Sequence, residues 1–124
     1  MSWYAASAIF VFRVRSGKQR RFPVWENVYL IEATSDVDAL RKAEQLAKDQ
    51  QVTDATLTLD GKPAELSYAG IRKVLTIENP FPADPNADRP RDGTEVTYSE
   101  FTVSSEKEIK KLLRGERLSV VYEA

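Results

Sequence analysis

The chain has 124 residues, of which 42% are hydrophobic and 30% charged, as in an ordinary soluble globular protein. Its net charge of −1 provides no overall field that would draw it toward nucleic acid or membrane. It has no Cys and no His, which excludes disulfides, zinc sites, His-ligated haem and Ser-His-Asp triads. We therefore expect a single domain over residues 1–124, without a cofactor and more suited to binding than to catalysis.

The first predicted element is a strand over residues 3–15, because apolar side chains alternate there. Its apolar run resembles a secretory signal, but the positive charges of Arg13 and Arg15 follow the run instead of preceding it. No later stretch is long enough to span a bilayer. These features predict a cytoplasmic protein that does not bind membranes.

The second element, residues 23–33, is the densest run of strand-favouring residues, and we expect the rest of the chain to be organised around it. Both of its faces are largely apolar, which predicts a strand covered on both sides. A turn at Ser16–Gln19 joins it to the first strand as an antiparallel hairpin. One face would carry Trp25, Asn27, Tyr29, Ile31 and Ala33, and the other Val24, Glu26, Val28, Leu30 and Glu32.

A helix through about Asp49 follows, introduced by Ser35 as a capping residue. Next, Asp60-Gly61 separates alternating segments and predicts a second hairpin, whose second arm (64–77) has a bulge at Gly70. The helix would turn toward the sheet an apolar stripe of Val37, Leu40, Ala43, Leu46 and Ala47.

Residues 79–93 form a Pro/Asp-rich loop. Polar residues on both faces of 94–103 indicate an edge strand, and a capping box opens a short helix that ends at Gly115. A last strand covers 118–122. The order β-β-α-β-β-β-α-β predicts an α+β fold: an antiparallel-dominated sheet of five to six strands with two helices on one face, ferredoxin-like.

Three groups of residues are candidate sites. The first is a polar pair among aromatic residues, which is typical of ligand pockets. The favoured interpretation is that the pair braces the strand end through hydrogen bonds, with ligand binding as the alternative. The group comprises Trp3, Trp25, Glu26, Asn27 and Tyr29.

The second candidate is a basic patch around the first turn, without any intervening acid. A phosphate or an acidic partner could bind there, but the favoured interpretation is a solvated hairpin tip protected by its charge. Nucleic acid is disfavoured, because the chain is nearly neutral and no aromatic residues are interleaved. The patch comprises Arg13, Arg15, Lys18, Arg20 and Arg21.

The third candidate is the acidic loop, where oxygen ligands fall at positions 1, 3, 5, 9 and 12 of a calcium-binding pattern. Against calcium, Arg89 occupies the position that requires Gly, and no helix pair flanks the loop. A solvated acidic loop is therefore favoured. The ligands would be Asp84, Asn86, Asp88, Asp92 and Glu95.

Three segments together resemble the small bacterial proteins grouped as domain of unknown function 4288. They are Trp3-Tyr4-Ala5-Ala6, the run 25–33 (WENVYLIEA), and the following Ser-Asp-x-x-Ala-Leu-x-Lys-Ala helix. The resemblance covers residues 3–48. It implies a small, bacterial, soluble protein and brings with it neither an activity nor functional residues.

We interpret the chain as a non-enzymatic protein-interaction or regulatory module that self-associates, as a homodimer. Its expected partner is a protein or a second copy of itself. The edge-like strand 94–103 and the two-faced apolar strands support this interpretation. The alternative is a small-molecule-binding protein or cofactor-free enzyme that uses the aromatic group around Trp25, Glu26 and Asn27.

Overall fold

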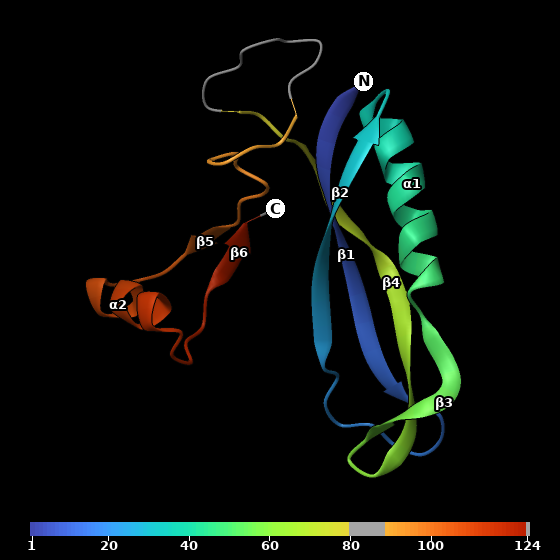
Figure 1. The fold of residues 1–124 in the computed structure, drawn as a ribbon. Helices are drawn as coiled ribbons and strands as arrows, with labels where there is room; N and C mark the ends of the chain where they lie inside the picture. The colour runs from blue at the N-terminus through green and yellow to red at the C-terminus, as the bar shows by residue number, and fades with distance from the viewer. Residues whose placement is uncertain (80–88, 124) are drawn as a thin grey trace.

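The computed structural model describes residues 1–79 and 89–123, in which six strands and two helices follow the predicted order (Figure 1). Four strands form an antiparallel sheet in the order β2-β1-β4-β3, and β5 and β6 form a separate antiparallel pair. The elements are β1 (Ser2–Val14), β2 (Val24–Ala33), α1 (Asp36–Asp49), β3 (Val52–Leu59), β4 (Lys62–Thr76), β5 (Glu100–Thr102), α2 (Glu106–Arg114) and β6 (Val121–Glu123).

The α+β class, the antiparallel pairing and the two helices are confirmed, but the ferredoxin-like arrangement is not. In the part of the chain that the structure describes, β5 and β6 do not join the main sheet, and only α1 packs on it. The prediction of two helices on one face is therefore wrong. The three-residue strands β5 and β6 pair with each other, and α2 lies away from the sheet beside that pair (Figure 1).

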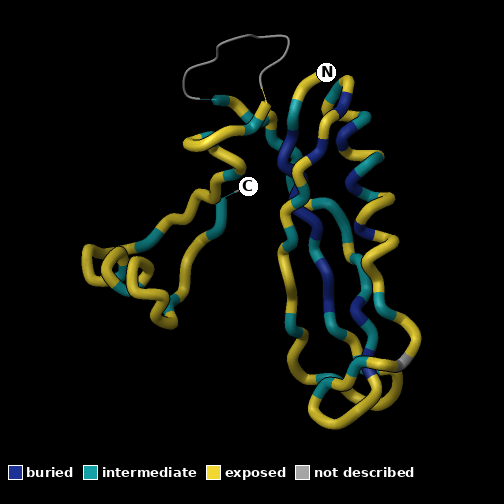
Figure 2. The backbone as a smooth tube through the Cα atoms, viewed as in Figure 1, coloured by how far each residue is buried: buried dark blue, intermediate teal, exposed yellow. Residues whose placement is uncertain are grey.

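The central strand is β1, not the stretch 23–33. β1 pairs with β2 on one side and with β4 on the other, and much of it is buried (Figure 2). Side chains on both of its faces are buried, including Ser7 and Phe10. β2 is an edge strand, and the prediction that it is covered on both sides is wrong because every residue of one face is exposed: Val24, Glu26, Val28, Leu30 and Glu32. Trp25 and Val28 are about half exposed, while Ile31 is buried.

Helix α1 contacts the sheet through three alanines four residues apart, Ala39, Ala43 and Ala47, all fully buried. The predicted stripe shares two of them, but Val37, Leu40 and Leu46 are exposed. Small side chains let the helix axis approach the sheet closely, so the bulkier residues remain at its flanks. The predicted cap is confirmed, since the Ser35 hydroxyl accepts a hydrogen bond from the Asp38 backbone N–H at 3.1 Å.

Strand β4 contains two irregularities in its pairing with β1, one on each side of Gly70. Ser7 pairs with Lys73 but Ala8 with Ile71, so Arg72 is an extra residue. Two residues further along β1, between Ile9 and Phe10, Ala69 is extra in the same way. The predicted bulge is confirmed and is in fact double. Asp60 and Gly61, with φ of 53° and 78°, form the predicted hairpin turn before β4.

The segment 100–123, here called the C-terminal unit, has no buried residue in its helix, and it is mostly exposed (Figure 2). Its predicted helix caps are confirmed: the Ser105 hydroxyl accepts from the Glu108 N–H, and Gly115 ends α2 with φ 71°. Both strands are shorter than predicted. Two cations of β4 make contacts on this side: Arg72 lies against the Tyr122 ring of the unit, and Lys73 donates to the carbonyl of Tyr98, which precedes the unit.

Candidate interaction surface

The residues of the predicted aromatic pocket do not come together. The β1–β2 register places Trp3 opposite Glu32, whereas Glu26 lies opposite Ile9, six residues further along β1. Six strand residues correspond to about 20 Å, so Trp3 lies far from Trp25 and Glu26. Trp25 instead packs edge-on against Phe12, with ring centroids 5.0 Å apart.

Glu26 and Asn27 point to opposite faces of β2, as neighbours in a strand do. The Glu26 carboxylate lies 4.0 Å from the Arg72 guanidinium across the sheet, an ion pair in which both side chains are about one third exposed. This contact agrees with the bracing interpretation. On the other face, the Tyr29 hydroxyl is buried without a hydrogen-bond partner in the described part of the chain.

The outer edge of β2 is open. In an antiparallel edge strand, alternate residues direct their N–H and C=O groups away from the sheet. The Pro23 carbonyl accepts from the Phe12 N–H of β1, so the residues that point outward are Val24, Glu26, Val28, Leu30 and Glu32. Among the described residues, the only group that reaches this row is the Lys42 ammonium, which donates to the Glu32 carbonyl at 2.8 Å.

Large apolar side chains accompany this open edge. Val24, Trp25, Val28 and Leu30 are between 44% and 54% exposed, although they belong to one ten-residue strand. Exposed edges are usually protected by charges, bulges or Pro. β2 carries two glutamates but has no bulge in its pairing with β1, and its single neighbouring Pro precedes the strand.

A groove of about 440 Å³ runs between β2 and α1 beside this edge. Lys42 reaches across one side of it and also lies 3.9 Å from Asp38. The pKa of Asp38, which is also paired with Arg41, is lowered chiefly by the hydrogen bond from the Thr34 backbone N–H and then by Arg41. The groove is lined by Leu30, Ile31, Glu32, Arg41, Lys42, Gln45 and Leu46.

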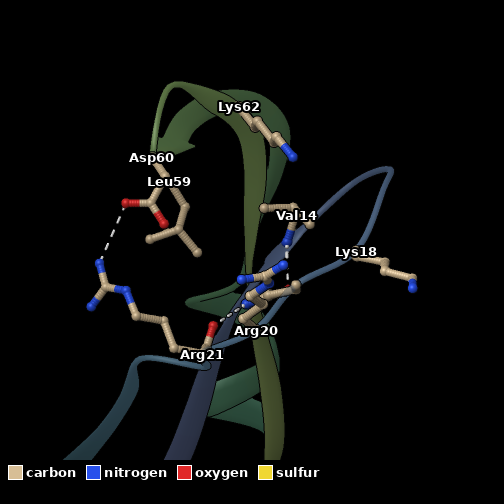
Figure 3. A pocket seen from close by; sticks show the side chains of 8 residues that line it. Val14, Lys18, Arg20, Arg21, Leu59, Asp60 and Lys62 are labelled. Carbon is tan, nitrogen blue, oxygen red and sulfur yellow. Dashed lines mark hydrogen bonds and ion pairs between the residues drawn. The ribbon is translucent and has the colours of Figure 1, made fainter.

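The predicted basic patch is divided by the structure. The Arg13 guanidinium lies over the Phe22 ring at 5.7 Å, and Arg15 pairs with Glu65 at 3.1 Å. The other three cations line a pocket together with Lys62 (Figure 3). Lys62 was not predicted from the sequence as part of the patch. It directly follows the predicted Asp60-Gly61 turn, and the tip of that hairpin lies at the same end of the sheet as the 18–21 loop.

Three of the five predicted calcium ligands, Asp84, Asn86 and Asp88, lie outside the described residues. The remaining two are Asp92 and Glu95. Over residues 1–79 and 89–123, no three acidic side chains lie together in a way that could hold a metal ion. Glu95 instead forms an isolated backbone bridge with Glu78.

A family model described as "Domain of unknown function (DUF4288)" matches residues 3–98. The match extends well beyond the 3–48 segment that carried the resemblance, and it ends two residues before β5. It therefore covers the whole four-stranded sheet and α1 but not the C-terminal unit. No curated protein and no solved structure matches the chain. Neither helix in the described ranges has the length and apolar character needed to cross a membrane.

Proposed function

Because the chain belongs to the DUF4288 family, whose description assigns no activity, we propose a function from geometry alone: a non-enzymatic interaction module that self-associates through the β2 edge. The observation that carries this proposal is the open row of backbone groups from Val24 to Leu30, flanked by half-exposed apolar side chains. A partner strand would satisfy the hydrogen bonds and cover the side chains together. We place this homodimer in the bacterial cytoplasm as part of the same proposal.

A second copy of the chain fits this edge because β2 is complementary to itself. Two β2 strands related by a two-fold axis would pair antiparallel, and each outward residue would face another outward residue. With Val28 on the axis, Glu26 faces Leu30 of the other copy and Val24 faces its Glu32. No two glutamates are then directly opposite, which avoids the repulsion that like charges cause across a strand pair.

The proposed register is testable with one cysteine, since the natural chain has none. Two residues that exchange hydrogen bonds across an antiparallel pair have Cα atoms about 5.5 Å apart, within the range that a disulfide spans. Val28→Cys should therefore form a disulfide-linked dimer under mild oxidation, visible on a non-reducing gel. Val37→Cys, on the exposed start of α1, is the matched control and should remain monomeric on the gel.

The oligomeric state provides the second test. Val28→Lys should convert a dimer into a monomer in light scattering, because two ammonium groups would face each other directly across the two-fold axis, whereas Val37→Lys should leave the dimer intact. Circular dichroism would show that both variants fold. A wild-type chain that stays monomeric at high concentration, with no cross-linking of Val28→Cys, would contradict the proposal.

A further inference from the structure

A second site, independent of the β2 edge, lies at the tip of the sheet. There the loop between β1 and β2 meets the turn between β3 and β4 and encloses a pocket of about 300 Å³ (Figure 3). Lys18, Arg20 and Arg21 come from the loop, and Asp60 and Lys62 come from the turn. This volume is at the lower end of the range for small-ligand pockets.

The pocket is held in shape by backbone contacts on both sides. The Gln19 side chain accepts from the Val14 N–H at 3.0 Å and donates to the Phe12 carbonyl at 2.7 Å and to the Arg21 carbonyl at 3.0 Å. The Arg15 N–H donates to the Pro63 carbonyl at 3.0 Å, which ties the loop to β4. These bonds fix the loop that carries the cations before any ligand arrives, so little ordering is needed on binding.

The charge of the pocket is strongly one-sided. Four of its lining residues are cationic and one is acidic, a net charge of +3 in a chain whose total is −1. Arg21 pairs with Asp60 at 3.4 Å. Within the described ranges, Lys18, Arg20 and Lys62 have no carboxylate partner, so three cations around one small cavity are available to an anion.

We propose that this pocket binds a phosphate group, either as inorganic phosphate or as the phosphomonoester of a small molecule. Guanidinium and ammonium groups donate charge-assisted hydrogen bonds to phosphate oxygens, and several donors around one cavity suit a compact dianion. None of the described lining residues is aromatic, so the pocket offers no surface on which a nucleobase could stack. The same absence favours a small phosphate over a single-stranded nucleic acid.

Calorimetry on the full chain at low ionic strength would test the site, with inorganic phosphate and ribose 5-phosphate as probes and chloride as the control anion. We expect saturable binding of one equivalent. Binding of both probes would indicate recognition of the phosphate alone, and preference for the ester would indicate a phosphorylated small molecule. Amide NMR shifts should change at residues 16–21 and 59–62.

Two variants move the affinity in opposite directions. Arg20→Gln with Lys62→Gln should weaken phosphate binding roughly tenfold, which corresponds to about 1.4 kcal/mol. Asp60→Asn should strengthen it, because it removes the one acidic group, and Asn tolerates the positive φ of 53° at this turn. Lys107→Gln with Lys110→Gln on α2 is the charge-matched control and should bind as the natural chain does.

Several results would overturn the proposal. These are no saturable binding at millimolar phosphate, equal affinity in all variants, or affinity for an RNA oligonucleotide that falls steeply with salt while phosphate itself does not bind. Heteronuclear NMR spectra of each variant would establish that it is folded, so that a loss of binding reports on the pocket.

Discussion

The guanidinium carbon of Arg72 lies 3.2 Å from the centre of the Tyr122 ring, and this contact joins the four-stranded sheet to the C-terminal unit. The Arg72 side chain also lies 4.0 Å from Glu26 on β2. No secondary-structure element of the described C-terminal unit packs its backbone against the sheet. The position of residues 100–123 therefore depends on a few side chains rather than on a shared core.

Arg72→Ala should loosen the C-terminal unit while the sheet stays folded. A cation–π contact at an exposed site contributes about 0.5–1 kcal/mol, which is small beside the stability of a domain. Hydrogen exchange should accelerate in 100–123 and remain unchanged in β1. Arg41→Ala, which removes an exposed arginine of α1, is the control, and equal exchange in the two variants would contradict the role given to Arg72.

Phe10→Ala should be far more destabilising than Trp25→Ala. Phe10 is fully buried on the central strand, and truncating a buried Phe costs about 3–5 kcal/mol. Trp25 is 52% exposed on an edge strand, so its loss should cost about 1 kcal/mol. Chemical denaturation of both variants would measure the difference, and equal losses would mean that β2 is as central as β1.

Ala43→Leu should lower the free energy of unfolding by about 1–3 kcal/mol, because Ala43 has no exposed surface and a larger side chain would push α1 away from the sheet. Val37→Leu, on the same helix but 73% exposed, should change it by less than about 0.5 kcal/mol. Thermal melting monitored by circular dichroism would compare the two. If the Ala43→Leu variant melted at the same temperature as the natural chain, the helix would have to pack through another face.

Asp38→Asn should lower the melting temperature at neutral pH, and the difference from the natural chain should close in acid. The pKa of Asp38 in the folded protein is lowered by the Thr34 backbone hydrogen bond and by Arg41. Its charge therefore stabilises the fold above the ordinary aspartate pKa of about 3.9, and this contribution is lost as pH falls through the lower, folded value. Asp36→Asn controls for the loss of a charge at the same helix end. A difference that persists at low pH would contradict this origin.

Local signals in the sequence predicted the elements well. Ser35, Ser105 and Gly115 cap helix ends through contacts with residues close by in the sequence, and these three caps were predicted. Strand order was not predicted, because it depends on which strands pair over long distances. β1 and 23–33 are both apolar on two faces, and only the pairing of β1 with β4 makes one central and the other an edge.

The candidate sites show the same division between local and distant contacts. The cations of the 18–21 segment were found because they are adjacent in sequence, but Lys62 reaches them only through the fold. The pairing of Trp3 with Glu32 was equally hidden, since a hairpin register depends on the length of its loop. The β2 edge is open because β2 is the first strand in the sheet order β2-β1-β4-β3. The alternation of apolar and polar side chains in the sequence does not reveal this order.

The bulge at Arg72 in β4 affects how the sheet contacts the segment that contains Tyr98 and Tyr122. In a regular strand, Arg72 and Lys73 would point to opposite sides, and one of these cations would enter the alanine-lined layer beneath α1. The bulge turns both toward the same side, where one meets Tyr122 and the other the Tyr98 carbonyl. Shortening β4 by that one residue would leave the sheet able to form but would remove one of the two cation contacts that hold residues 98–122 beside it.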